Sequence, residues 1–489
     1  MSELVSLNES VSIEQGKSIG AVWLLYQMAR RLGIEKALGN SRDGKLALWQ
    51  VLSRVIDQGS RLSAVRLASE HSCSEVLGLS GFDEDNLYEN LDWLAGNQSD
   101  IEDRLYKSRK GADVPQLFLY DVTSSYLEGD CNELSDWGYN RDKKRGKKQI
   151  VIGLLCEADG KPAAVEVFRG NTRDLSTFGA QVKKVSGRFG CSRVTMVGDR
   201  GMIKSGQVED VKKAGFHYIT AITKREIESL LKSGVIQLDM FDEKLCEAFE
   251  EGVRYVIRRN PVRANEISLT RQSKRESIEV FVETKNRYLT EPERAKVEVA
   301  LRDVRAKIRK LWVSGWLKAR SEGRMLILEV DDAALLHESR FDGCYVLKTD
   351  LPRDVASKEV VHDRYKDLAK VDRAFRAMKT AHLEVRPVYV RLEERTRAHV
   401  FVVMLAYMIT RELDVCWKIL NLTVAEGISN LSSLCSDKLI IKGTPRCLQI
   451  PEPRDSVKAL FLAAKIDLLP VLPNRNSVIA TNKKLTRMS

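Results

Sequence analysis

The sequence lacks a long apolar run. Its most apolar stretch, Val400 to Ile409, has ten residues, whereas a bilayer span needs about 20. No basic segment followed by an apolar run opens the chain, so we expect no secretory signal. Proline is also scarce, with 11 in 489 residues, and low-complexity tracts are missing. We therefore expect a folded protein without a membrane span and without extensive disorder.

Cysteine spacing and the familiar catalytic motifs exclude further classes of site. The nine cysteines are scattered and form no CxxC pair, so neither a disulfide framework nor a zinc ribbon is indicated. The six histidines never fall in HExxH spacing, and GxGxxG is absent. GxSxG occurs once, from Gly16 to Gly20, and GxxxxGK once, from Gly39 to Lys45. No strand-like run precedes either motif, and Leu46 replaces the Ser or Thr of the phosphate-binding motif. We interpret both as chance matches.

What is present in excess is positive charge. The chain has 79 Lys and Arg against 68 Asp and Glu, which gives a net charge of +11 and a pI of about 9.1. This balance favours a polyanionic partner, most simply nucleic acid. The length predicts more than one domain.

Hydrophobic periodicity divides the chain into four regions. Residues 1–110 read as a helical, possibly DNA-binding domain, with Arg30, Arg31, Arg54, Arg61 and Arg66 expected on exposed faces. From there, runs alternate in the order of three strands, a helix, a strand, a helix and a strand. The strands are expected at 117–120, 149–156, 163–168, 194–198 and 217–222. This order predicts an α/β fold with an RNase H-like mixed five-stranded sheet, in which the first and fourth strands are central neighbours.

The predicted sheet domain, residues 111–224 and 341–420, is interrupted by a segment of different character. Residues 225–340 read as a β-rich insertion, with strands near 255–257, 278–282 and 325–328 and a strongly charged helix near 293–311. The basic face of that helix is either a nucleic-acid contact or a solvated surface. One long helix is expected from Val355 to Thr380, and residues 421–489 form a C-terminal helical region.

Three acidic residues stand out in this frame. Asp121 and Asp199 each close an apolar strand-like run, and Asp372 lies on the long helix. Carboxylates at strand ends sit at the rim of a sheet, where ligands meet the scaffold. Converging carboxylates suit Mg²⁺, which prefers few protein ligands together with water and phosphate. The three residues therefore predict a site for metal-dependent phosphoryl transfer.

The residues around these acids resemble those of bacterial insertion-sequence transposases. The closest group is the DDE branch with a helical Tyr-x2-Arg-x3-Glu-x6-Lys signature, whose spacing is kept here by Tyr365, Leu368, Asp372 and Lys379. The resemblance spans roughly residues 18 to 435. It is carried by the segments 120–126, 168–172, 197–203, 383–389 and 395–401.

This sequence departs from the signature at two positions. Leu368 stands where the family has Arg, and Asp372 stands where it has Glu. Because the Asp372 side chain is shorter, either its helix lies closer to the metal than in the family, or this protein is a weakened or inactive member. Glu384 is the alternative third acid, although a salt bridge to Arg386 is the simpler interpretation of it.

The resemblance implies a cytoplasmic, nucleoid-associated bacterial transposase that cleaves transposon ends and joins the freed 3′-hydroxyls to target DNA. Asp121, Asp199 and Asp372 would be catalytic and would hold two Mg²⁺ ions, which Mn²⁺ could replace. The partner would be double-stranded DNA, with a homodimer assembled on it. The predicted DNA contacts are Tyr365, Arg376, Lys379 and Arg200. Two alternatives remain open: an RNase H-like nuclease that does not join ends, and a catalytically inactive DNA-binding relative.

Overall fold

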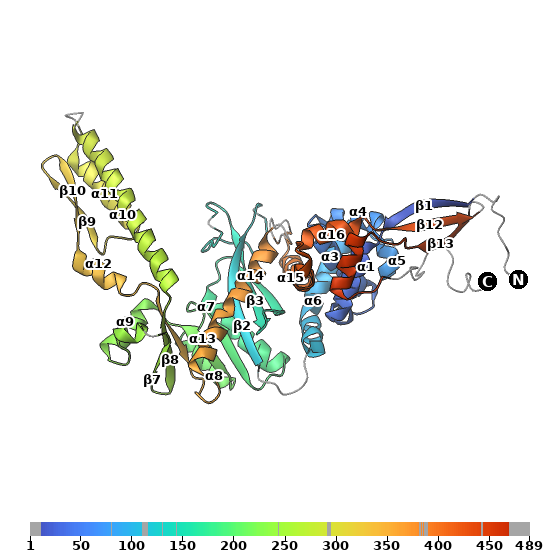
Figure 1. Cartoon of the computed structure of the whole chain (residues 1–489), viewed down its shortest axis with the longest axis horizontal. Coiled ribbons are helices and arrows are strands. Elements are labelled where there is room, and N and C mark those ends of the chain that lie inside the picture. The colour runs from blue at the N-terminus through green and yellow to red at the C-terminus, as the bar shows by residue number, and fades with distance from the viewer. Residues whose placement is uncertain are drawn as a thin grey trace. The chain divides into compact units, whose positions relative to one another are not determined.

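The structure is a computed structural model of the whole chain (Figure 1). It describes residues 11–79, 81–109, 116–129, 131–142, 144–242, 244–290, 295–380, 383, 385, 390–441 and 444–468. The chain divides into two compact units. The first unit contains residues up to Tyr218 and from Lys366 onward, and the second contains Ile219–Tyr365. None of the described helices is both long enough and apolar enough to cross a membrane.

Among the residues that the structure describes, the first unit begins with a strand and six helices and continues with the strands of the central sheet and the helices between them. Its N-terminal elements are β1 (Val11–Ser18), α1 (Gly20–Arg31), α2 (Ile34–Leu38), α3 (Arg42–Ile56), α4 (Arg61–Glu70), α5 (Cys73–Leu77) and α6 (Glu84–Arg109). Next come β2 (Gln116–Tyr126), β3 (Gln149–Glu157), β4 (Pro162–Arg169), α7 (Asp174–Lys183), the π-helical turn η1 (Lys184–Arg188), β5 (Val194–Gly198), α8 (Ser205–Lys213) and β6 (His217–Ala221), whose residues from Ile219 onward belong to the second unit. Its C-terminal elements are α14 (Leu368–Lys379), α15 (Glu393–Trp417), η3 (Lys418–Leu420), α16 (Val424–Ser432), β12 (Cys435–Ile441), β13 (Thr444–Gln449) and α17 (Asp455–Ala464).

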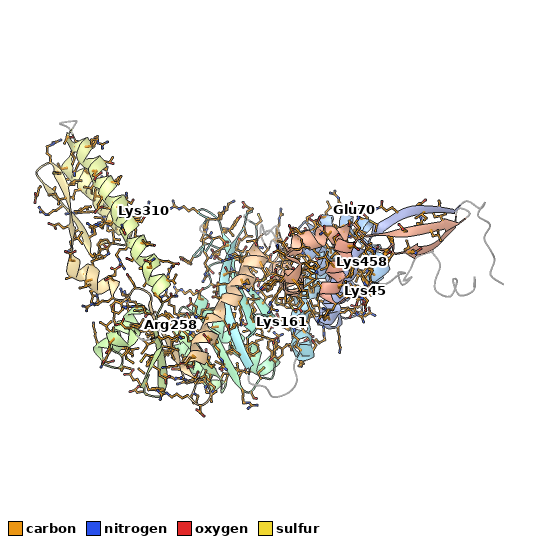
Figure 2. All side chains as sticks on the ribbon, viewed as in Figure 1. Lys45, Glu70, Lys161, Arg258, Lys310 and Lys458 are labelled. Atoms are coloured by element: carbon orange, nitrogen blue, oxygen red, sulfur yellow. The ribbon has the colours of Figure 1, made fainter. Side chains whose placement is uncertain are left out.

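The second unit is more helical than the sequence indicates. Its elements are α9 (Lys224–Lys232), η2 (Leu238–Phe241), β7 (Cys246–Glu250), β8 (Val253–Arg259), α10 (Pro261–Thr290), α11 (Val297–Lys310), β9 (Leu317–Glu322), β10 (Met325–Val330), α12 (Asp332–Ser339), β11 (Cys344–Thr349) and α13 (Lys358–Lys366). Buried side chains of α10 and α11 share one core with Trp316 and the β9–β10 hairpin. Arg302, Arg309 and Lys310 of α11 are exposed, and Lys310 is labelled in Figure 2.

The expected strand at 278–282 is wrong, because these residues lie inside α10. Ile278 and Val282 are buried while Val280 is 62% exposed. Burial at positions i and i+4, with exposure between them, is helical spacing. The β-branched residues of this short run are typical of a strand, but the packing of Ile278 and Val282 against α11 stabilises the helix.

The large sheet is mixed, with eight strands in the order β4-β3-β2-β5-β6-β11-β8-β7. Within it β2 pairs antiparallel with β3 and parallel with β5, and the first and fourth expected strands are therefore neighbours. A separate three-stranded sheet, β1-β12-β13, joins segments near the two ends of the chain and was not expected from the sequence.

The central strands β2, β3 and β5 of the first unit are buried on both faces. Phe118, Tyr120 and Val122 of β2 point into a core with α7 and α8. Because side chains alternate along a strand, Leu119, Asp121 and Thr123 point to the opposite face. That is the face on which Thr123 accepts a hydrogen bond from a side chain of α14.

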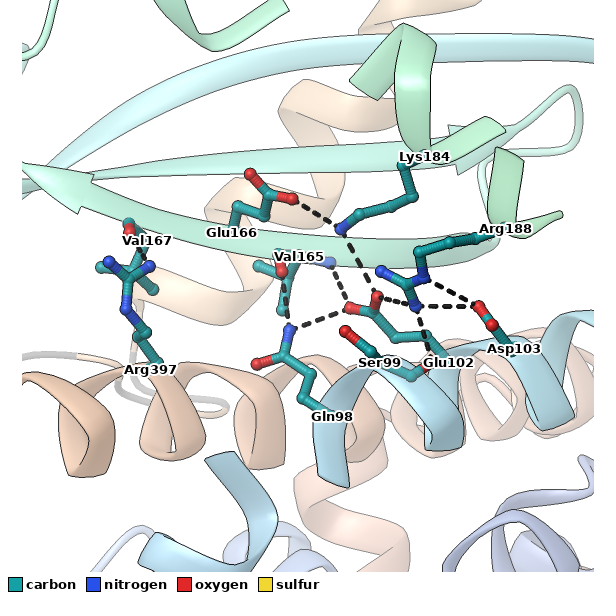
Figure 3. Close-up of polar contacts among 10 residues, drawn as sticks. All are labelled: Gln98, Ser99, Glu102, Asp103, Val165, Glu166, Val167, Lys184, Arg188 and Arg397. Carbon is teal, nitrogen blue, oxygen red and sulfur yellow. Dashed lines mark hydrogen bonds and ion pairs between the residues drawn. The ribbon is translucent and has the colours of Figure 1, made fainter. Parts of the chain in front are cut away.

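A buried ionic cluster joins α6 to the sheet (Figure 3). We call it the Glu102 network. The Glu102 carboxylate accepts hydrogen bonds from the Val165 amide at 3.2 Å and the Gln98 side chain at 2.9 Å. It also pairs with Lys184 at 3.4 Å and Arg188 at 3.2 Å, and both of these cations come from η1. The π-helical turn thus places two cations on one buried carboxylate.

Two arginines expected on exposed faces are buried instead. Arg61 bonds the His399 ring at 3.1 Å, and Arg54 donates to the carbonyl of Gln58 at 2.6 Å. Burial, aided by the nearby Arg54 charge, lowers the pKa of Arg61 to about 9. The sequence pattern could not reveal these contacts, because His399 lies on α15, far along the chain.

Candidate active site

Asp121 and Asp199 are brought side by side by the register of two parallel strands. The last Cα pair between β2 and β5 is Tyr120 with Gly198, so each aspartate is the next residue of its chain. The expectation that Asp121 closes its strand is wrong, because β2 continues to Tyr126. It does so through its antiparallel pairing with β3, while its pairing with β5 ends at the aspartate.

The two aspartates share a local hydrogen-bond geometry. Asp121 Oδ1 accepts from the Val122 amide at 2.8 Å, and Asp199 Oδ1 accepts from the Arg200 amide, also at 2.8 Å. Each carboxylate therefore accepts a hydrogen bond from the amide of the next residue in the chain. After Asp199 the chain turns, with the Met202 amide donating to the Asp199 carbonyl at 2.9 Å.

The third acid comes from α14. The expected single helix from Val355 to Thr380 is wrong, because α13 ends at Lys366 and α14 begins at Leu368. On α14, Asp372, Arg376 and Lys379 lie three or four residues apart and so share one helix face. Val371, Ala374, Phe375 and Met378 are the buried residues that fix this helix.

One cavity of about 420 Å³ contains the three acids, and all its lining residues belong to the first unit. The lining residues are Asp121, Val122, Thr123, Arg141, Asp174, Asp199, Gly201, Met202, Asp372, Phe375, Arg376, Lys379 and Thr380. The structure thus brings together acids separated by long stretches of sequence.

The carboxylates of the cavity disfavour one another's charge. Burial, together with the nearby Asp372 and Asp199 charges, raises the pKa of Asp121 to about 7, despite the amide bond from Val122 and the Arg141 charge. Partial burial and the Asp199 charge likewise raise the pKa of Asp372, against the opposing effect of Arg376. The site therefore has an excess of negative charge that a bound cation would offset.

Two charged residues of the cavity wall, Arg141 and Asp174, and the neighbouring Asp142 were not foreseen from the sequence. Arg141 pairs with Asp174 at 2.6 Å, so a guanidinium and a fourth carboxylate belong to the same wall. Asp142 binds Lys379 from the neighbouring position. Arg141 and Asp142 lie in the loop after β2, and only the fold brings Arg141 to the cavity and Asp142 to Lys379.

Lys379 has contacts that the signature alone does not reveal. Its ammonium donates to Asp142 Oδ1 at 2.8 Å, to Thr123 Oγ1 at 3.0 Å and to the Ser124 carbonyl at 2.8 Å. A lysine has three donors, and these acceptors tie α14 to β2 and its loop. In this conformation the Lys379 ammonium contacts protein acceptors, and its contact with phosphate stays a prediction.

The remaining predicted residues are placed differently. Arg376 is exposed and lines the cavity. Arg200 is exposed, next to Asp199. Tyr365 is half-buried on α13 and is the last residue of the second unit, so it belongs to a different unit from Asp372. Glu384, the alternative third acid, lies outside the described residues.

The donor set fits a hard divalent ion. Within the described part of the chain, no three His, Cys, Asp or Glu side chains lie close enough to bind one ion together. Mg²⁺, however, commonly takes one or two carboxylates and keeps its remaining ligands as water or phosphate. Asp121, Asp199 and Asp372 offer only oxygen donors and carry unfavourable mutual charge. These properties match that requirement.

Comparison with known proteins identifies the family. The piggyBac transposase in a synaptic complex with hairpin DNA is a similar solved structure, with 11% identity and a TM-score of 0.37. That similarity covers 91% of this chain and 75% of the other. A search of curated proteins gives no significant match. The family described as transposase DDE domain matches residues 113–409, which include all three acids of the cavity. The chain belongs to the DDE transposase family.

Proposed function

We propose that this transposase cleaves DNA at transposon ends and joins the freed 3′-hydroxyls to target DNA, with Asp121, Asp199 and Asp372 as its catalytic carboxylates. The observation that carries the proposal is their convergence, from β2, β5 and α14, in one cavity within the family-matched region. The strand order β4-β3-β2-β5-β6 supports an RNase H-like catalytic core.

The three carboxylates would hold two Mg²⁺ ions, with Mn²⁺ able to substitute. Bound there, such ions activate an attacking oxygen and stabilise the leaving oxygen of an in-line displacement. The protein's own part is to hold the carboxylates in place. The Val122 and Arg200 amides orient two of them, and the Lys379 bonds fix α14 against β2.

Cationic side chains on the cavity wall suit a phosphodiester. Arg376 lies on the same helix face as Asp372, and Arg141 is held in place by Asp174. Guanidinium groups bind phosphate oxygens through paired N–H donors. The net charge of +11 agrees with a double-stranded DNA partner. Joining two ends calls for two protomers assembled on DNA.

One observation keeps an alternative open. Asp372 is exposed, and its side chain is one methylene shorter than the family's Glu. A protein that binds ends without cleaving them would follow if Asp372 did not reach the ion. A protein that cleaves without joining is the other alternative.

A strand-transfer assay separates these functions. Purified protein is incubated with DNA carrying the element's terminal sequence, a target plasmid, and Mg²⁺ or Mn²⁺. Joined products support the proposal, cleaved but unjoined ends support a nuclease, and binding alone supports an inactive relative.

Asp372→Glu sharpens the assay, because it restores the family's side chain at an intact spacing. A change in activity in either direction places residue 372 at the metal. Asp367→Asn is the matched control, since Asp367 precedes α14 and pairs with Lys370 at 2.8 Å. If Asp372→Glu and Asp372→Asn both matched this control, the assignment of the third acid would be wrong.

A further inference from the structure

Two large aromatic side chains are exposed in the loop that leads to Arg141 of the cavity wall. Trp137 is 60% exposed and Tyr139 is 82% exposed, both in the loop of residues 136–142, which we call the aromatic loop. We propose that Trp137 and Tyr139 form a stacking platform for unpaired DNA bases next to the carboxylate cavity. The proposal rests on the proposed function and adds to it a class of ligand, unpaired nucleotides.

The aromatic loop is held firmly at its start. Asp136 exchanges two backbone hydrogen bonds with Gln149 of β3, at 3.1 and 3.0 Å. Its carboxylate accepts from the Trp137 amide at 2.7 Å and from Asn171 at 2.7 Å. The exposure of Trp137 is therefore not that of a loosely attached segment, and a held aromatic side chain loses little entropy when it binds.

Gly138, between the two aromatic residues, is pressed against the chain after β4. A Cβ at this position would lie 2.1 Å from the Gly170 carbonyl oxygen, so no larger residue fits. The backbone contact at Gly138 leaves Trp137 and Tyr139 on the solvent side, as their exposures show.

The end of the aromatic loop belongs to the cavity. The Arg141 guanidinium lies 5.9 Å from the centre of the Tyr139 ring, and it also pairs with Asp174 on the cavity wall. The next residue, Asp142, binds Lys379 of α14. The Arg141 guanidinium thus lies between the Tyr139 ring and the wall of the cavity. A DNA strand whose phosphate entered the cavity would therefore pass close to the ring.

The basic residues after the aromatic loop favour nucleic acid over protein as the ligand. Lys144 and Arg145 are exposed, and the Lys144 ammonium lies 5.5 Å from the centre of the Tyr126 ring. Aromatic rings combined with a basic track are the usual device for single-stranded nucleic acid, since bases stack and phosphates pair. A protein partner would be the other occupant of an exposed aromatic pair, but a basic track next to a phosphate-binding cavity favours DNA.

Equilibrium binding in EDTA tests this idea without any cleavage. The probes are a thymidine 12-mer and a 12-base-pair duplex, measured with the full chain. Trp137→Ala and Tyr139→Ala should each weaken binding of the single strand by about tenfold, the scale of one lost base stack. Duplex binding should change by less than about twofold, because phosphate contacts dominate it.

Two further variants make the result specific. Trp137→Phe should keep the affinity for the single strand but lose most of the tryptophan fluorescence change on binding. Leu462→Ala is the matched control, since Leu462 is a 76% exposed apolar residue of the same unit, on α17. It should leave both affinities unchanged. Melting temperatures should be equal for all variants, because every changed side chain is exposed.

The proposal is overturned if the double variant Trp137→Ala/Tyr139→Ala binds the single strand as tightly as the wild type. It is also overturned if the two probes lose affinity equally, which would indicate a general change of surface. Because no metal and no cleavage enter this measurement, it can fail while strand transfer succeeds. Equally, it can succeed while strand transfer fails.

Discussion

The first unit holds two groups of partly buried charges that differ in their balance. In the Glu102 network, every acid faces a cation, with Lys184 between Glu102 and Glu166 and Arg188 between Glu102 and Asp103. In the cavity, burial and the nearby Asp372 and Asp199 charges raise the pKa of Asp121 to about 7, although Arg141 also lines the cavity. Paired buried charges fix one arrangement of a fold, whereas a carboxylate in a cleft whose pKa is strongly raised by burial and like charges marks a candidate functional site. We therefore interpret the network as structural and the cavity as the site of chemistry.

The largest effect is expected from neutralising the cavity. Asp121→Asn or Asp199→Asn should lower the rate of DNA cleavage by about 10³-fold or more, as loss of an essential catalytic group does. DNA affinity should stay within about threefold, because phosphate contacts provide it. Single-turnover cleavage and a gel-shift titration measure the two quantities, with Asp367→Asn as the control. Substantial cleavage by either variant would refute the catalytic assignment.

Removing the central acid of the Glu102 network should affect the stability of the protein rather than its DNA cleavage. Glu102→Ala removes the buried carboxylate that Lys184 and Arg188 share. Since each cation keeps its second carboxylate, Glu166 or Asp103, the loss should exceed that of a surface pair and reach at most about 3–5 kcal/mol, the cost of a fully broken buried pair. Urea unfolding measures this loss of free energy of unfolding. The control is Asp92→Ala, which removes the more exposed partner of Arg395 and should cost at most about 1 kcal/mol. Equal losses in the two variants would mean that the network is not special.

Neutralising a cavity carboxylate in the absence of metal should have a smaller effect, and it should raise stability rather than lower it. The pKa of Asp121 is raised from 3.8 to about 7 on folding. Between these values the folded protein keeps a proton that the unfolded chain has lost, so stability falls as pH rises through this window. Asp121→Asn should therefore raise the melting temperature in EDTA by about 2 °C or more at pH 8. At pH 3.5 the difference should vanish. A destabilised variant at pH 8 would contradict the charge imbalance.

The smallest effect concerns neither region but the basic face of α11. Arg302, Arg309 and Lys310 are exposed, and replacing all three by Ala should reduce the salt dependence of DNA affinity by about three phosphate contacts. Arg305 is kept, because its Nε donates to the Ala319 carbonyl at 3.1 Å. Arg320→Ala is the control, since that guanidinium already pairs with Glu322 and Glu329. An unchanged slope in the triple variant would make this face a solvated surface only.

The sequence predicts the site best where an apolar run marks a strand and the acid follows it directly. The strand runs ending near Asp121 and Asp199 are strongly apolar, and the parallel pairing of their strands brings the two acids together. The spacing of the family signature also picks out Asp372, which lines the same cavity. These inferences need only hydrophobic runs and spacing.

Long-range contacts are what the sequence could not provide. The bonds of Lys379 to Asp142 and Thr123 join segments more than two hundred residues apart. The burial of Arg61 depends on His399, which lies on α15. The pairing of β1 with β12 likewise joins the two ends of the chain. Each depends on which surfaces meet in the fold, and periodicity within one segment carries no record of it.

The central claim is that the cavity carboxylates hold divalent metal for DNA cleavage, and Mn²⁺ binding tests it most directly. Mn²⁺ is titrated into the protein bound to end DNA, and free Mn²⁺ is followed by electron paramagnetic resonance. The account predicts saturable binding by the wild type, and about tenfold or greater weakening in Asp121→Asn and Asp372→Asn, since each loses a charged ligand. Asp367→Asn should bind as the wild type does. Equal Mn²⁺ affinity in all four proteins would contradict the account.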